Sequence, residues 1–119
     1  GAADVRLTGS NVEELVFNGV TVAPGSTSER IYFDDVARFF KEFIFVVRAE
    51  IGHTYSVDVL WNMRYPGTFP AFREFERFEI TSRDFRSDPL DFKSERPSIR
   101  INNDGTVPHQ YDLSILWRR

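Results

Sequence analysis

The two histidines are the residues best suited to metal chemistry in this sequence. His53 and His109 each stand directly before an alternating strand pattern, where we expect a turn. Imidazole nitrogens are common zinc ligands, so two such turns would supply half of a tetrahedral site. No third ligand accompanies them at a diagnostic spacing, and the sequence has no cysteine. We therefore favour surface or turn-bonding histidines over a metal site, and we expect no cofactor.

Acidic residues form a second cluster in the segment 84–91. Asp84, Asp88 and Asp91 lie there, and Asp34 and Asp35 occupy the related place in the first half of the chain. Clustered carboxylates suit calcium, but the spacing lacks the Asp-x-Asp-x-Asp-Gly pattern. Basic residues that can pair with these acids stand close by, namely Arg83, Arg86, Lys93 and Arg96. Salt-bridged or solvated acids are the favoured interpretation, and calcium binding stays open.

Catalytic residue types are present without a pattern that would align them. Glu74, Glu76 and Glu79 offer carboxylates, but nothing in their spacing marks a pair held for acid and base work. No nucleophile-elbow motif and no glycine-rich phosphate loop occurs. We therefore expect a protein that is not an enzyme.

Aromatic residues on a proline-rich segment form the best candidate for ligand binding. Tyr65, Phe69 and Phe72 lie in a stretch that contains Pro66 and Pro70 and has no strand period. Aromatic side chains on a stiff loop lose little entropy on binding, so they suit protein anchors or sugar-stacking platforms. Alternatively, Tyr65 and Phe69 fold back and close one end of the domain.

We predict that the chain is built around two matching segments, which contain both histidines. His53-Thr-Tyr-Ser-Val-Asp-Val-Leu-Trp61 returns as His109-Gln-Tyr-Asp-Leu-Ser-Ile-Leu-Trp117 without a gap. Apolar and small or polar residues alternate in both segments, as in a strand with one buried face. Both tryptophans fall on the apolar face, so we predict that they lie in the core.

The remaining patterns predict an all-β fold. We expect an antiparallel β-sandwich of about eight strands, built from two pseudo-repeated units at about 16–61 and 72–117. Residues 12–119 would form this single domain. Residues 1–11 would form a flexible arm or an edge strand, in which Val5 and Leu7 are candidate partner-binding residues because an arm can add to a neighbour's sheet edge.

Three local patterns predict finer detail. Asn18-Gly19 between apolar runs predicts a type I′ hairpin turn. Asp34 predicts the cap of a single helical turn. The segment 43–49 is apolar on both of its faces, so we expect a central strand that is covered on both sides.

Charge and hydropathy exclude some partners. The net charge of −3 arises from 18 acidic and 15 basic residues that are mixed along the chain. A stripe of basic residues that would follow nucleic-acid phosphates is therefore missing, and we expect no nucleic-acid partner. No apolar run approaches the roughly 18 residues that cross a bilayer, so we expect no membrane partner either.

Several stretches resemble the β-sandwich (jelly-roll or Ig-like) domains of bacteriophage virion and appendage proteins. They are the run from Phe43 to Asn62, the segment Asp88-Pro-Leu-Asp-Phe-Lys-Ser, and Ser98-Ile-Arg-Ile-Asn-Asn-Asp-Gly with Tyr111-Asp-Leu-Ser-Ile. The resemblance covers about residues 28–117. It departs from the family at Asn62-Met-Arg-Tyr, where the acidic turn would stand.

The resemblance implies a structural or host-recognition module of a head, neck or tail, commonly oligomeric. We expect a non-enzymatic assembly or decoration module of a virus particle that contacts other proteins or copies of itself. Its location would be the virion or the extracellular space. The alternative is a carbohydrate-binding or host-receptor-binding module that uses Tyr65, Phe69 and Phe72.

The alternative predicts glycan binding that depends on the aromatic segment. On a broad glycan array, the chain would bind a defined sugar, and Tyr65→Ala and Phe69→Ala would each abolish the signal, because stacking area is lost. Silence of the unaltered chain on such an array would remove this alternative.

Overall fold

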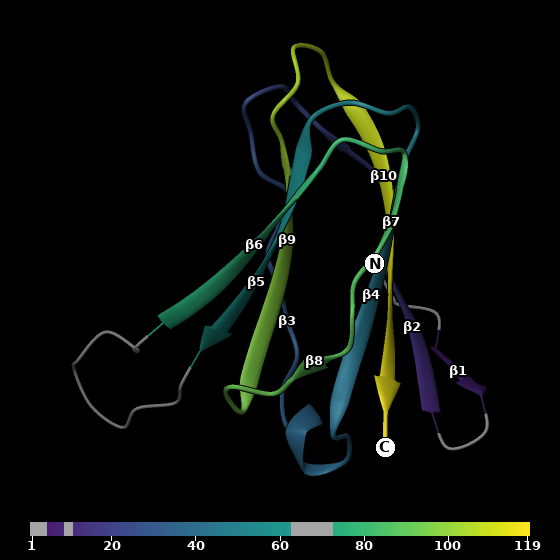
Figure 1. The fold of residues 1–119 in the computed structure, drawn as a ribbon, viewed down its shortest axis with the longest axis vertical. Coiled ribbons are helices and arrows are strands. Elements are labelled where there is room, and N and C mark those ends of the chain that lie inside the picture. The colour runs from purple at the N-terminus through teal and green to yellow at the C-terminus, as the bar shows by residue number, and fades with distance from the viewer. Residues whose placement is uncertain (1–4, 9–10, 63–72) are drawn as a thin grey trace.

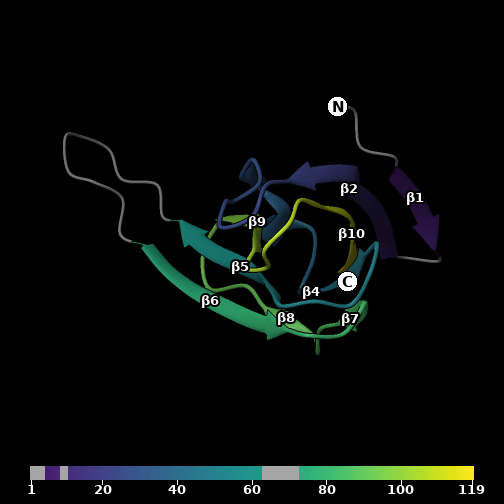
Figure 2. The ribbon, with the colours of Figure 1, turned by 90° about the horizontal axis from the view of Figure 1, so that it is seen from above.

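The chain folds into two antiparallel β-sheets that pack against each other as a sandwich (Figures 1 and 2). The computed structural model describes residues 5–8, 11–62 and 73–119. Within these residues, the one helical piece is the short 3-10 turn η1 (Val36–Arg38). The predicted all-β sandwich is confirmed at this level.

Sheet A has the strand order β1-β2-β10-β4-β7, and β8 also pairs with β4. Its strands are β1 (Val5–Thr8), β2 (Asn11–Val22), β4 (Glu42–Ala49), β7 (Asp84–Arg86), β8 (Leu90–Asp91) and β10 (His109–Arg118). Sheet B has the order β3-β9-β5-β6. Its strands are β3 (Ile31–Tyr32), β5 (Tyr55–Asn62), β6 (Arg73–Ile80) and β9 (Arg96–Asn103). The described residues thus form ten strands instead of about eight, because β1 extends sheet A and its other edge is divided between β7 and β8.

The two matching segments form β5 and β10, which face each other across the core from central positions in opposite sheets. At one end, the rings of His53 and His109 stack with their centroids 3.6 Å apart. The rings of Tyr55 and Tyr111 follow at 5.3 Å. Residues at equivalent places in the two segments therefore meet in the interior.

Aromatic side chains fill the other end of the core. Phe43 lies between the two tryptophans, with its ring centroid 5.8 Å from Trp61 and 5.2 Å from Trp117. Each tryptophan is only 1% exposed, which confirms that both belong to the core. Such tilted and edge-to-face ring pairs add about 0.5–1.5 kcal/mol each beyond the burial of their area.

The predicted hairpin at Asn18-Gly19 is wrong, because β2 continues through it as one strand. Gly19 has a φ of 70°, and the pairing of β2 with β10 shifts register at this point. The Gly19 amide donates to the Asp112 carboxylate at 2.6 Å. The left-handed glycine therefore forms a bulge, since β10 offers a partner on both sides of it.

The helical turn is present where predicted, but Asp34 does not cap it. The residue before the turn is Asp35, which has a φ of 60° and makes no side-chain cap bond. Asp34 instead accepts a hydrogen bond from Arg96 at 2.8 Å. The side chain of Asp34 therefore pairs with the distant Arg96 and does not cap the helical turn.

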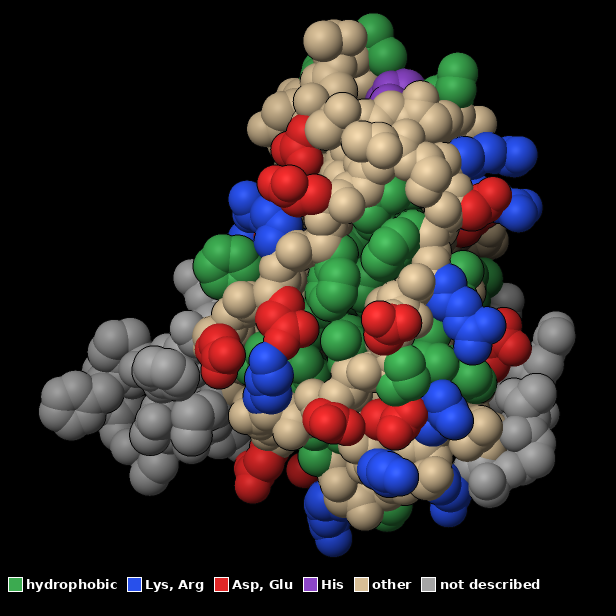
Figure 3. Space-filling view, in the orientation of Figure 1, with side chains coloured by type: hydrophobic (Ala, Val, Ile, Leu, Met, Phe, Trp, Pro, Cys, Tyr) green, Lys and Arg blue, Asp and Glu red, His purple; other side chains and the backbone are tan. Residues whose placement is uncertain are grey.

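The sandwich is open along the side where β6 and β7 lie. Figure 3 shows hydrophobic side chains between the two sheets there, bordered by charged side chains. Phe78 of β6 and Phe85 of β7 are only partly buried. Lys93, just after β8, pairs with Glu76 of β6 and so connects the two sheets across the opening.

The two tryptophans should respond differently to replacement by phenylalanine. Trp117 Nε1 donates to Glu14 Oε1 at 3.3 Å, whereas the buried Trp61 Nε1 has no acceptor among the described residues. Trp117→Phe loses a hydrogen bond, and Trp61→Phe removes an unsatisfied donor. We expect Trp61→Phe to cost about 1 kcal/mol less in the free energy of unfolding, measured by urea denaturation.

Phe39→Leu serves as the control for this comparison, because Phe39 is 60% exposed. It should change the free energy of unfolding by less than about 0.5 kcal/mol. A larger loss in Trp61→Phe than in Trp117→Phe would contradict the environments described above.

Candidate functional site

The stacked histidines are bonded in a way that holds the two sheets together. His53 Nδ1 lies 2.8 Å from the Ile51 carbonyl, which can only accept, so Nδ1 carries the proton. In the neutral ring, Nε2 then accepts from the Tyr111 hydroxyl at 2.6 Å. Burial raises the pKa of Tyr111, so this hydroxyl stays protonated and can donate. His109 Nδ1 lies 3.0 Å from Glu50 Oε1.

The expected turn-bonding role of His53 is confirmed, but the expected surface position of His109 is wrong. Only 7% of His109 is exposed, because its ring lies against that of His53. The two matching turns do come together. Both Nδ1 atoms nevertheless face oxygen partners, so the pair acts as a structural contact in this arrangement.

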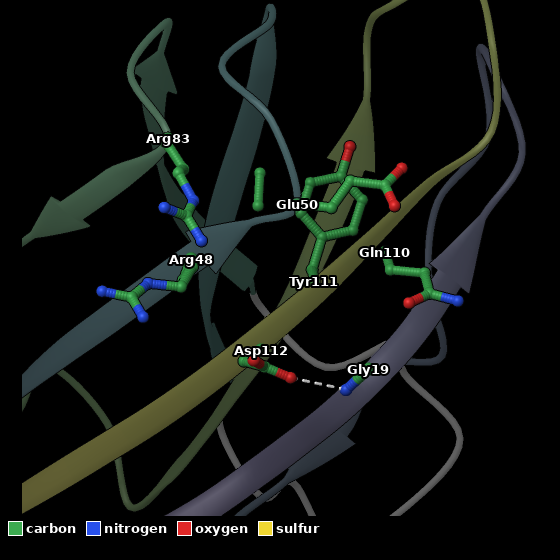
Figure 4. Close-up of a pocket in the computed structure, with 8 residues that line it drawn as sticks. Gly19, Arg48, Glu50, Arg83, Gln110, Tyr111 and Asp112 are labelled. Carbon is green, nitrogen blue, oxygen red and sulfur yellow. Dashed lines mark hydrogen bonds between the residues drawn. The ribbon is translucent and has the colours of Figure 1, made fainter.

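A small polar pocket of about 130 Å³ lies beside this pair. Figure 4 shows Arg48 and Arg83 on one side of it and Glu50 and Asp112 on others. Arg48 is paired with Asp84 at 2.5 Å, and Asp112 accepts from the Gly19 amide. Charges of both signs line the pocket, so it selects no ligand of a single charge.

The outer face of sheet B carries a more organised set of side chains. Because side chains alternate along a strand, the residues of β5 that do not enter the core point outward. They are Ser56, Asp58, Leu60 and Asn62, and all four are nevertheless buried. Long side chains from the neighbouring strands cover them. We call this surface the arginine face, after Arg30, Arg77, Arg96 and Arg100.

Asp58 is the centre of the arginine face. Its side chain is fully buried, and Arg77 Nε and Arg100 Nε donate to its two oxygens at 2.8 Å each. Asn102 Nδ2 adds a third donor at 3.0 Å. Burial alone would raise the pKa of Asp58, but the hydrogen bonds from Arg77, Asn102 and Arg100 outweigh it and hold this pKa below its usual range. A carboxylate that accepts hydrogen bonds from two arginines holds their side chains in place, and its lowered pKa makes it a poor general base.

Two aromatic residues flank this network. Tyr32, Ser98, Leu60 and Phe75 are register partners in one row across β3, β9, β5 and β6. Tyr32 is 41% exposed and Phe75 is 51% exposed. The guanidinium carbons of Arg96 and Arg30 lie 4.2 Å and 4.6 Å from the centroid of the Tyr32 ring. Cation–π contacts of this kind fix the orientation of exposed aromatic rings.

Hydrogen bonds continue the network toward the far end of β5. Arg30 Nε donates to Ser98 Oγ at 2.8 Å, and Arg30 also donates to the Asn62 side chain. Asn62 Nδ2 donates in turn to Ser98 Oγ at 3.0 Å. Hydrogen bonds therefore connect Arg30, Ser98 and Asn62 into one network on the arginine face, and side chains that are already bonded lose less entropy when a surface binds.

The site residues that the sequence predicts lie outside the described part of the structure, either entirely or in their side chains. Tyr65, Phe69 and Phe72 lie outside the described residues. Val5 and Leu7 belong to β1, which pairs with residues 11–14 of β2 at the edge of sheet A; their side chains lie outside the description. Within the described residues, no group of three or more His, Asp or Glu side chains is placed to hold a metal ion.

The acidic segment 84–91 forms an ion pair with a distant strand. Asp84 bonds Arg48 of β4, and this partner was not among the four nearby basic residues that the sequence offers. Sequence reasoning also missed the arginine face. A signal for it was present, since Asp58 interrupts an otherwise apolar segment that becomes a central strand.

No protein-family model matches this chain, and no curated protein matches it significantly. In the described part of the chain, no helix is long and apolar enough to span a membrane.

The buried carboxylate predicts a stability that depends on acid pH. Because the pKa of Asp58 is lower in the folded chain than in the unfolded chain, its contribution is present above about pH 4 and is lost as the pH falls through the folded-state pKa. Asp58→Asn should cost about 2 kcal/mol at pH 7, and the difference should shrink toward pH 2. Urea denaturation at both pH values measures it.

Asp84→Asn is the matched control, because its pair with Arg48 is exposed on both sides. We expect a cost below about 1 kcal/mol at pH 7. Equal costs for the two variants, or an Asp58→Asn cost that does not change with pH, would argue against a buried ionised anchor.

Proposed function

We propose that this protein is a non-enzymatic structural module of a virus particle or a similar extracellular assembly, and that it works through protein–protein contacts. The observation that carries the proposal is the arginine face. Arginine, tyrosine and phenylalanine are enriched in protein interfaces, and arginine and tyrosine are frequent among the few residues that supply most of the binding energy. Here Tyr32 and Phe75 are exposed over a network centred on Asp58, which itself is fully buried.

The burial of the polar groups favours a protein partner. A partner that covers Tyr32 and Phe75 does not need to strip water from Asp58, because its side chain is already bonded by Arg77, Arg100 and Asn102. The desolvation penalty of binding is therefore small for this carboxylate. Apolar area and outward-facing guanidinium groups remain for the partner to use.

The edge of sheet A supports the same kind of role. β1 adds to β2 by main-chain pairing over four register partners, and the rest of that β2 edge pairs with no described strand. An open edge accepts a further strand from a neighbouring protein. The resemblance to phage virion domains agrees with such an assembly role.

We further propose that eight of the strands derive from two equivalent four-stranded units, β2–β5 and β6–β10 without β7. Register supports this proposal. In the pair β3–β9, Ile31 lies opposite Ile99 and Tyr32 lies opposite Ser98. In the equivalent pair β8–β4, Leu90 lies opposite Phe43 and Asp91 lies opposite Glu42. The partners in β9 follow those in β4 at the same sequence separation that relates His109 to His53.

Co-purification tests the proposed function. The tagged chain is expressed together with the structural proteins that are encoded by adjacent genes. We expect a stable complex with at least one of them, and the double variant Tyr32→Ala/Phe75→Ala should weaken its affinity at least about tenfold, because the exposed aromatic area is lost.

Ile51→Ala/Val107→Ala is the matched control, since both residues are exposed and apolar but lie away from the arginine face. This variant should keep full affinity. A complex that tolerates Tyr32→Ala/Phe75→Ala, or partners that are enzymes and not structural proteins, would refute the proposal.

A further inference from the structure

A groove of about 290 Å³ crosses the outer face of sheet A, on the side of the sandwich opposite to the arginine face. We call it the sheet A groove. One row across it places Glu13 of β2 beside Leu116 of β10 and Ile44 of β4. The next row places Ser114 of β10 beside Val46 of β4, and Val46 beside Arg86 of β7.

The floor of the groove is apolar in a place where a solvated sheet face would be polar. β4 carries apolar side chains on both faces, as a strand does that is covered twice. On its outer face, Ile44 is 2% exposed but Val46 is 43% exposed. The expected second cover over Val46 is therefore missing among the described residues. An exposed apolar centre with a polar surround is the anatomy of a protein interface.

The charges around the groove indicate what covers it. Glu13 lies on the β2 side, where Arg6 of β1 is its register neighbour, and Arg86 lies on the β7 side. Neither residue forms an ion pair or a side-chain hydrogen bond with another side chain that the structure describes. The charged residues at the two ends of the face are paired internally, as Arg118 with Glu42 and Arg48 with Asp84. Two charges of opposite sign thus lie on opposite sides of an apolar centre.

This arrangement is complementary to itself. Consider a two-fold axis that lies in the interface and runs roughly along the strands, between β10 and β4. It carries β2 of one copy over β7 of the other, so Glu13 meets Arg86 twice while the Val46 side chains meet in the middle. In such an isologous contact, each residue pair occurs two times.

We infer that the sheet A groove is the contact surface of a homodimer, in which Glu13 of each copy pairs with Arg86 of the second copy. Sheet A is five strands wide at a spacing of about 4.8 Å, and its strands β2, β10 and β4 are eight residues or longer whereas β1 and β7 are shorter, so the face measures at most about 19 by 26 Å. At most about 500 Å² per copy, or about 1,000 Å² in total, is the size of a weak, transient interface, so the dimer is reversible and depends on concentration.

Sedimentation equilibrium over a range of concentrations tests the inference on the full chain. The mass should rise from 13.9 kDa toward twice that value. Glu13→Arg and Arg86→Glu should each raise the dissociation constant at least about tenfold, because each places like charges together at two sites. The double variant Glu13→Arg/Arg86→Glu should return to within about threefold of the unaltered chain, because the pairs re-form with reversed sign.

Two further variants sharpen the outcome. Val46→Asp should abolish the dimer, whereas Val107→Asp, at a site that is 52% exposed and outside the groove, should not change it. The inference is overturned by a chain that is monomeric at every concentration, by single reversals without effect, or by a double reversal without rescue. It is also overturned if deletion of residues 1–10 alone removes the dimer, because association then runs through the edge beside β1.

The inference rests on the proposed function and names a second copy of the chain as one partner. Dimer formation and binding through the arginine face can be refuted independently of each other. Tyr32→Ala/Phe75→Ala should leave the dimer intact, because the arginine face lies on the other sheet. Charge reversals in the groove should in turn leave binding through the arginine face intact.

Discussion

The contact between β5 and β10 constrains the rest of the molecule. Each strand is central in its own sheet, and their large side chains meet across the core from the histidine pair to the two tryptophans. Burial of apolar and aromatic area is the main term that stabilises a domain of this size. Once these faces are buried against each other, strand alternation determines which side chains must point outward.

The outer faces of the two sheets carry different kinds of outward-pointing side chains. On sheet B, the outward residues of β5 are mostly polar, and arginines from β6 and β9 neutralise and cover Asp58. On sheet A, the outward residues Ile44, Val46 and Leu116 are apolar, and Val46 among them lacks such cover, with 43% of it exposed. One sandwich therefore presents a preorganised cationic and aromatic surface on one side and an apolar groove on the other.

The sequence predicted what depends on local period, and it missed what depends on distant partners. Alternation identified β5, β10 and the buried tryptophans, because the period of 2 is a property of the strand itself. Asn18-Gly19 was misread as a turn, since a bulge requires knowledge of β10. The partners of Asp58 lie 19, 42 and 44 positions away, so the arginine face becomes visible only when β6, β5 and β9 are side by side. The stacking of His53 on His109 likewise required both sheets.

The central claim is that β5 and β10 lie face to face through their matching residues. Nuclear Overhauser contacts between aromatic side chains test it most directly, because they report protons that lie within about 5 Å of each other. We expect cross-peaks between the rings of His53 and His109, and between those of Tyr55 and Tyr111. An assigned spectrum of the folded chain in which both pairs lack cross-peaks would contradict the account.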